Sequence, residues 1–280
     1  MSTIDEASAW ELLAALPPGL AGRSRYRQSV GEFALEVTAA GGWRASHPLA
    51  PEAARLLELY LPLRIADSLV IAQLGQSLDG RIATRAGHSH FVTGPADIRH
   101  LHRLRALVDA VVVGAGTVAA DDPQLTVREV SGSNPLRVVL DPRCRLPARH
   151  RLFSDGAVAT LRLHAPEMGA RAVHSTVEYE AVPVSGSGFA PETVIEVLAR
   201  RGMRRILVEG GGSTVSRFLQ AGVLDWLFVT VAPMIIGSGI HGLALPEIET
   251  LDQALRPSCR HMDLGDDVLF VFHWPRRPDR

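Results

Sequence analysis

From residue 69 to the end of the chain, short apolar runs rich in β-branched residues alternate with segments of helical periodicity. This alternation is typical of an α/β domain, because parallel strands need long crossover connections that are usually helices. We therefore expect buried strands at 69–74, 110–113, 136–140, 157–161, 206–208, 226–231 and 268–272. Between them we expect helices at 95–108, 191–202 and 213–222. Proline opens the first two helices, and glycine closes the last two.

The two ends of the chain differ from this alternation. Residues 260–274 turn at Gly265 and Asp266 in a pattern typical of an antiparallel hairpin, so the central sheet is predicted to be mixed but mostly parallel. At the other end we expect a helix, a strand and a second helix at 4–16, 32–38 and 51–60. This end holds no chemical motif. We therefore divide the chain into a small N-terminal appendage, 1–64, and a main domain, 65–280.

Charge and cysteine content narrow the classes of partner. The formal net charge is −1, so no overall field attracts nucleic acid or an anionic membrane, and a small molecule is the expected partner. Cys144 and Cys259 are too few for a disulfide framework or a cysteine-rich zinc site, which favours a reducing, cytoplasmic compartment. The first residues lack the pattern of a signal peptide, and no apolar stretch reaches membrane-spanning length. Lysine is absent, which excludes Schiff-base chemistry and a P-loop lysine.

A buried strand runs into a glycine-rich turn at 111–123. Gly114, Gly116 and Ala119 match a loose dinucleotide-binding fingerprint, and a Rossmann domain is one interpretation. A Rossmann crossover needs a helix of some length, however, and Asp-Asp-Pro at 121–123 interrupts the chain soon after the glycines. We therefore expect no helix here, and backbone N–H groups that face phosphate within a different α/β fold.

A second strand, at 206–208, ends in Glu209 and three glycines before a helix begins. Backbone N–H groups from Gly210 to Thr214 are expected to be unpaired at the helix start, where the helix dipole adds positive potential. Three consecutive glycines cost chain entropy, so a group is expected to approach the backbone closely. This segment is predicted to bind phosphate.

Taken in order, these motifs resemble one family. Leu-Asp-Gly-Arg at 78–81 is followed by Thr-Gly-Pro at 93–95, by Arg-Leu-Arg at 103–105, by the glycine turn with Asp-Asp-Pro, by Val-Val-Leu-Asp at 138–141 and by Val-Glu-Gly-Gly-Gly at 208–212. This order resembles the reductase half of the bifunctional riboflavin deaminase/reductase, over roughly 69–274. The resemblance implies a dihydrofolate-reductase-like three-layer fold and an NADPH-dependent oxidoreductase that commonly forms a homodimer.

The resemblance also implies the cofactor site, in which NADPH lies across the carboxyl ends of central strands. Arg143 and Arg145 are candidates for the adenosine 2′-phosphate, because a guanidinium can hold a phosphate with two bonds. Phe91 stands where the family often has tryptophan. The cofactor-binding residues implied are Gly75, Phe91, Gly114, Gly116, Thr117, Asp121, Arg143, Gly210, Gly211, Gly212, Ser213 and Thr214.

For the substrate, the family pattern falls on Ser89, Arg105, Leu125, Arg128 and Glu209. The implied reaction moves a hydride from NADPH to C1′ of 5-amino-6-(5-phosphoribosylamino)uracil or a related ribosylamino-pyrimidine phosphate, which opens the ribose. The ring oxygen then needs a proton, for which Asp121 or an ordered water is a candidate. A related pterin reductase and a non-catalytic NADPH-binding module are the alternatives.

Other chemistries lack their motifs. The chain has neither the His-x-Glu nor the Pro-Cys-x-x-Cys segment of zinc deaminases, so deaminase activity is not expected. His88 and His90 are close in sequence, but two loop histidines are more often solvated than metal-bound, and no metal is expected.

Overall fold

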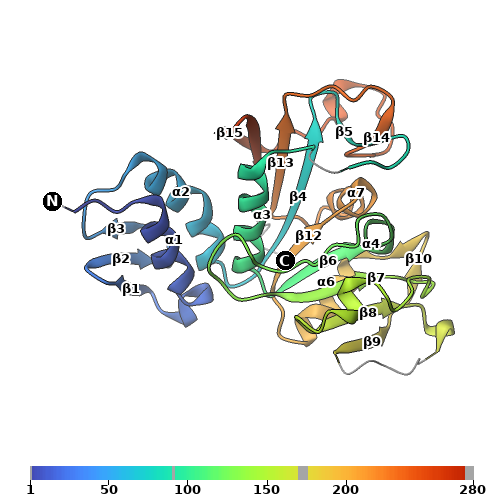
Figure 1. The fold of residues 1–280 in the computed structure, drawn as a ribbon, viewed down its shortest axis with the longest axis horizontal. Coiled ribbons are helices and arrows are strands. Elements are labelled where there is room, and N and C mark those ends of the chain that lie inside the picture. The colour runs from blue at the N-terminus through green and yellow to red at the C-terminus, as the bar shows by residue number, and fades with distance from the viewer. Residues whose placement is uncertain (1, 90–91, 170–175, 275–280) are drawn as a thin grey trace.

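The computed structural model describes residues 2–89, 92–169 and 176–274, and its main body is a nine-stranded sheet with helices on both faces (Figure 1). The strand order is β15-β16-β13-β4-β12-β6-β7-β8-β9. In chain order these strands are β4 (Leu69–Ser77), β6 (Ala110–Gly114), β7 (Leu136–Leu140), β8 (Thr160–His164), β9 (Val177–Ala181), β12 (Arg205–Glu209), β13 (Trp226–Ala232), β15 (Ser258–Leu264) and β16 (Asp267–His273). From β13 to β9 every neighbouring pair is parallel, whereas β16 and β15 form an antiparallel hairpin. The predicted mixed sheet is confirmed.

Alternate residues of the central strands supply two separate cores. In β4, Leu69 and Ile71 belong to one apolar cluster and Val70 and Ala72 to the other, as expected for a strand with both faces buried. Helices α6 (Pro191–Arg200) and α7 (Gly212–Gln220) pack on one face, and α3 (Pro95–Leu107) packs on the other. All three helices confirm the sequence prediction. Among the described residues, no helix is both long and apolar enough to cross a membrane.

Short elements that the sequence pattern missed surround the sheet ends. They are α4 (Ala115–Asp121), α5 (Arg151–Ser154), η2 (Pro166–Met168), η3 (Leu251–Gln253) and the strand pairs β5 (Arg81–Thr84) with β14 (Gly239–His241) and β10 (Val184–Ser185) with β11 (Gly188–Phe189). The strand expected at 157–161 begins later, at Thr160. Ala157 instead lies in a turn where its N–H donates to the Asp155 carboxylate at 3.0 Å.

The N-terminal region forms a small α/β unit beside α3 (Figure 1). It consists of α1 (Glu6–Ala15), η1 (Pro18–Gly22), an antiparallel sheet of β1 (Arg25–Val30), β2 (Phe33–Thr38) and β3 (Trp43–Ala45), and α2 (Pro51–Ile65). The helix predicted to end at residue 60 continues through Pro62. Proline cannot donate to the carbonyl four residues earlier, at Glu58, and Arg260 Nη2 donates to that oxygen instead at 3.2 Å.

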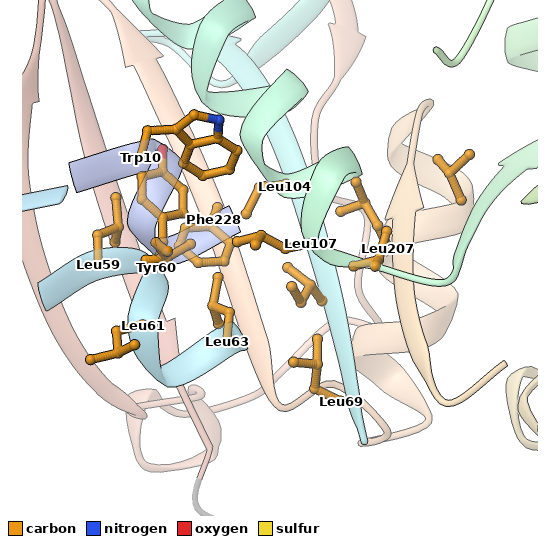
Figure 2. Close-up of a cluster of buried hydrophobic side chains, with 14 of the residues drawn as sticks. Trp10, Leu59, Tyr60, Leu61, Leu63, Leu69, Leu104, Leu107, Leu207 and Phe228 are labelled. Atoms are coloured by element: carbon orange, nitrogen blue, oxygen red, sulfur yellow. The ribbon is translucent and has the colours of Figure 1, made fainter. Parts of the chain in front are cut away.

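The N-terminal unit shares its core with the main domain. Trp10 and Tyr60 pack in one cluster with Leu104 and Leu107 of α3 and with Phe228 of β13 (Figure 2). Polar bonds cross the same boundary. Tyr60 Oη lies 2.6 Å from His100 Nδ1, Arg103 pairs with Glu6 at 2.8 Å, and Trp10 Nε1 donates to the Ser131 carbonyl at 2.9 Å. The predicted boundary after residue 64 falls in the last turn of α2, and the unit behind it is firmly attached to α3.

We expect the free energy of unfolding to fall as the pH drops from 6.5 to 5. Burial, and then the charge of Arg103, lowers the pKa of His100 from 6.5 to about 3. Within this pH window the unfolded chain binds the proton and the folded chain does not. The contribution of His100 to stability is therefore complete well above pH 6.5 and is lost at up to about 1.4 kcal/mol per pH unit below it. Denaturant titrations at several pH values measure this slope. His100→Gln should flatten the slope, and an equal slope in the variant would contradict the assignment.

Candidate active site

A cleft of about 910 Å³ lies across the carboxyl ends of β4, β12, β6 and β7. Because neighbouring parallel strands end on the same side, the loops that follow them converge there, as in other open α/β sheets. Gly75 of β4, Gly114 at the end of β6, Asp141 after β7 and Glu209 of β12 all line the cleft. The hairpin β10–β11 and strand β14 contribute further walls through Ser187 to Phe189 and through Ile240 and His241.

The two glycine segments meet in this cleft, as the sequence predicted. The Gly211 N–H donates to Thr117 Oγ1 at 2.8 Å, and a Cβ on Gly114 would stand 2.6 Å from Thr214 Oγ1. Thr117 lies on α4, so the expectation of no helix after the first glycine segment is wrong. A helix of 7 residues forms. It ends at Asp121, because the next residue, Asp122, adopts a left-handed conformation (φ 40°) and Pro123 follows it.

The three glycines after Glu209 meet different constraints. Gly210 has a φ of +119°, a conformation that side chains disfavour. Gly211 donates to Thr117, and the Thr214 N–H donates to the Gly211 carbonyl at 3.0 Å. The prediction that all N–H groups from 210 to 214 are unpaired is therefore wrong at 211 and 214. Gly212 is the first residue of α7. It packs so tightly against residue 242 that an added Cβ would overlap the Gly242 carbonyl oxygen.

Two predicted substrate residues, Arg105 and Glu209, bind each other. Arg105 Nε and Nη2 donate to the two Glu209 carboxylate oxygens, each at 2.7 Å, and both side chains are less than 10% exposed (7% and 6%). Arg105 Nη1 also donates to the Thr126 carbonyl at 3.0 Å. The positive charge of Arg105 and the negative charge of Glu209 are thus held in fixed positions at the cleft wall and offset each other.

His102, one helical turn before Arg105, is a site residue that the sequence interpretation missed. Its Nδ1 accepts the Arg128 N–H at 2.8 Å, and its Nε2 lies 3.5 Å from Arg105 Nη1. Burial, followed by the charges of Arg105 and Arg128, lowers the pKa of His102 to about 4. A neutral His102 therefore ties the segment around Arg128 to α3. The signal available in the sequence was the three-residue spacing of His102 and Arg105, which places both side chains on the same face of a helix.

The remaining substrate candidates divide into two groups. Ser89, Asp121 and Leu125 line the cleft, and Ser89 Oγ donates to Asp121 Oδ1 at 2.8 Å. Arg128 is exposed and is absent from the described cleft lining; its guanidinium donates to the Thr126 hydroxyl. Phe91 lies outside the described residues.

Three further arginines line the cleft. Arg143 and Arg145 both line it and are exposed. Asp141, which a Rossmann interpretation would give to a ribose, is fully buried. It accepts the Arg145 and Leu146 N–H groups, each at 3.1 Å, and pairs with Arg162 at 2.5 Å. The sequence interpretation missed Arg217, which lines the cleft from α7 and donates to the Phe189 carbonyl at 2.8 Å.

The cleft floor holds a buried acid that the sequence interpretation also missed. Asp97, on the first turn of α3, is 4% exposed and accepts hydrogen bonds from Thr230 Oγ1 at 2.6 Å and Thr93 Oγ1 at 2.7 Å. Gln73 Nε2 lies 3.2 and 3.3 Å from its two oxygens. Acidic residues are common in the first turn of a helix, where the helix dipole stabilises them, so the sequence alone gave no sign of another role for Asp97.

Comparison with known proteins places this geometry among reductases. Residues 68–265 match the family model described as the RibD C-terminal domain. The 2,5-diamino-6-ribosylamino-4(3H)-pyrimidinone 5′-phosphate reductase of Methanothermobacter thermautotrophicus is 34% identical over 210 residues, which is 72% of this chain and 96% of that protein. The protein of the same name from Archaeoglobus fulgidus is 38% identical over 60% of this chain and 81% of its own length. The structure of Acinetobacter baumannii RibD superposes with a TM-score of 0.63 at 26% identity, over 81% of this chain and 65% of that one.

Proposed function

The chain belongs to the RibD C-terminal domain family, which makes it a reductase of the riboflavin-pathway pyrimidine type, and from this premise we propose that it uses NADPH to reduce a ribosylamino-pyrimidine 5′-phosphate at C1′. One observation carries the proposal. Two glycine segments from separate strands converge on a single cleft, where Gly211 and Thr117 are joined by a hydrogen bond.

The residues present fit a dinucleotide. Gly75 lines the cleft, and a Cβ there would stand 2.8 Å from Thr93 Cγ2, so only glycine fits against Thr93 at this position. The start of α7, at Gly212 to Thr214, presents the positive end of a helix dipole to a diphosphate. Gly114, Gly116, Thr117 and Asp121 supply the opposite wall from β6 and α4.

In the proposed reaction the protein binds and orients, and bound NADPH supplies a hydride. Ser89 and Arg105 line the cleft and Arg128 is exposed outside its described lining, and we assign these three to the sugar phosphate as one hydroxyl and two guanidinium groups. Leu125 provides an apolar contact. Glu209, held by Arg105, keeps carboxylate lone pairs that can accept from amino groups of the pyrimidine. C1′ receives the hydride, its bond to the ring oxygen breaks, and that oxygen takes up a proton.

The test of this function is NADPH oxidation followed by absorbance. Two substrates are compared, the 2,5-diamino ribosylamino-pyrimidinone phosphate and its deaminated uracil form, with a dihydropterin as control. Turnover of either pyrimidine and none of the dihydropterin supports the proposal. NADPH binding without oxidation of any of the three would identify a binding module instead.

Arg143 and Arg145 are proposed to select NADPH over NADH. Replacing both by alanine should weaken NADPH binding about 10- to 100-fold for each lost contact, because a charge-assisted bond contributes about 1.5–3 kcal/mol. NADH affinity should stay the same, since NADH lacks the 2′-phosphate. Fluorescence titration measures both affinities. Arg149→Ala, an exposed arginine that the described cleft lining does not include, is the matched control. An equal loss for NADH and NADPH would contradict the assignment.

We also propose a cytoplasmic homodimer. Strand β15 is largely exposed along one edge of the central sheet, where a second copy could add its own strand, and both Cys144 and Cys259 are free thiols. Light scattering during size-exclusion chromatography distinguishes a dimer from a monomer.

A further inference from the structure

The floor of the cleft holds an acid in an unusual setting. Asp97 lines the cleft together with Gly75, and a Cβ on Gly75 would stand 3.3 Å from Asp97 Oδ2. Residue 75 therefore packs against this carboxyl with no side chain between them, and both residues belong to the cleft lining. Three neutral groups surround it, the hydroxyls of Thr93 and Thr230 and the amide of Gln73. No arginine is paired with it among the described residues.

This setting favours the protonated acid. Burial raises the pKa of Asp97 above its ordinary value, and the negative charge of Asp267 on β16 adds to the rise, although the three hydrogen bonds oppose it. The other charged groups nearby are Arg105 and Glu209 along the same cleft, which neutralise each other, and behind the helix Tyr60 lies within electrostatic range.

The other carboxyls that line the cleft have different surroundings. Both oxygens of Glu209 accept bonds from the guanidinium of Arg105. Asp121 is exposed, and Ser89 donates to it. Asp141 is fully buried and paired with Arg162. Asp97 therefore differs from the other three in combining burial, a place in the cleft lining and neutral partners.

We propose that Asp97 is the general acid of this reductase, in place of Asp121 or a free water, and that it gives its proton to the ribose ring oxygen of the substrate. The inference rests on the proposed function. As the ring oxygen takes the Asp97 proton, its bond to C1′ breaks and the electron pair stays on oxygen as a hydroxyl. C1′, left as an iminium carbon by the lone pair of the attached nitrogen, accepts the hydride from the dihydronicotinamide. Asp97 leaves the step as a carboxylate, and solvent returns its proton.

The first experiment measures protonation directly. Carbon-13 NMR of aspartate-labelled protein, with Asp97→Asn used to assign the signal, follows the Asp97 carboxyl as the pH changes and needs neither cofactor nor substrate. The signal should titrate above the range of ordinary aspartates. In Asp267→Asn its midpoint should move to lower pH, because the charge that raises it is gone. A midpoint at or below the ordinary aspartate value would overturn the proposal.

The second experiment measures turnover. General acid catalysis contributes about 10²–10⁴-fold, so Asp97→Asn should lower kcat by at least 100-fold with little change in the KM of the pyrimidine. Wild-type kcat should fall as the pH rises through the Asp97 midpoint, and in Asp267→Asn this fall should begin at lower pH. The melting temperature of each variant confirms that it is folded. Asp97→Glu, which restores an acid, should recover part of the lost rate.

The outcomes separate the two proposals. If the wild-type chain oxidises NADPH with neither pyrimidine, the proposed function fails, and with it the role of Asp97. If the wild type turns over and a folded Asp97→Asn keeps its kcat, the assignment of Asp97 alone is wrong. A raised KM with unchanged kcat would make Asp97 a binding residue, which also overturns the assignment.

Discussion

Replacing Arg105 by alanine is expected to lower the free energy of unfolding by about 3–5 kcal/mol and to abolish turnover. The loss of stability is expected because Glu209 would remain buried without Arg105. Glu209 is 5% exposed and has both oxygens bonded to Arg105, so the variant would hold a buried carboxylate without a counter-charge. The Thr126 carbonyl would lose its donor as well. Urea denaturation measures the stability change, and NADPH oxidation measures the activity.

A double variant separates the ion pair from the general effect of removing a large side chain. Arg105→Leu combined with Glu209→Leu should recover most of the lost stability, because replacing a buried ion pair by apolar residues of similar volume is often close to neutral. It should remain inactive, since the proposed substrate contacts are gone. A double variant no more stable than Arg105→Ala would show that the buried charge is not the cause.

Replacing Gly212 by alanine is expected to weaken NADPH binding at least about tenfold and to cost about 1–3 kcal/mol of stability, the usual range for overpacking. The added Cβ would overlap the Gly242 carbonyl oxygen and stand 2.7 Å from that of His241. Both obstacles are backbone atoms, so either the start of α7 or the β14 segment must move. The proposed diphosphate site lies at that helix start. Calorimetric titration with NADPH and a thermal melt measure the two effects.

Gly116→Ala is the matched control for this substitution. Its Cβ would meet only Arg145 Nη2 at 3.9 Å within the described structure, which is ordinary contact, and alanine within α4 favours the helix. Stability should therefore stay the same or rise. Any loss of NADPH affinity in this control reports the methyl group in the cleft alone. Wild-type affinity and stability in Gly212→Ala would contradict the close packing of α7 on β14.

The sequence predicted the parts of the fold that depend on local pattern. Buried β-branched runs gave the strand at 136–140 at its observed bounds and the strand at 69–74 within β4. Strand β9 was missed because Glu178, Tyr179 and Glu180 lack the apolar pattern of a central strand. The short pairs β5–β14 and β10–β11 were missed for a different reason: contacts with residues far along the chain stabilise them.

The candidate site was predictable where glycines or motifs mark it. Sequence order could not show that Arg105 would bind Glu209, because these residues are 104 positions apart and meet only when α3 packs beside β12. Asp97 was missed for a similar reason. Its chemistry comes from Gln73, Thr93 and Thr230, and two of these lie on strands that adjoin only in the folded sheet.

Helix α3 has one side against the N-terminal unit and another in the cleft, so it links residues 2–65 to the proposed active site. One side of the helix holds His100 and Arg103 against Tyr60 and Glu6, while its first and third turns place Asp97 and Arg105 in the cleft. A mutation in the N-terminal unit that displaces α3 is therefore expected to alter the reaction rate, although no residue of that unit belongs to the described cleft lining. A shortened version of the protein that starts at the main sheet would expose Leu104 and Leu107 to water and be prone to aggregate. Engineering of this reductase should accordingly keep both parts together.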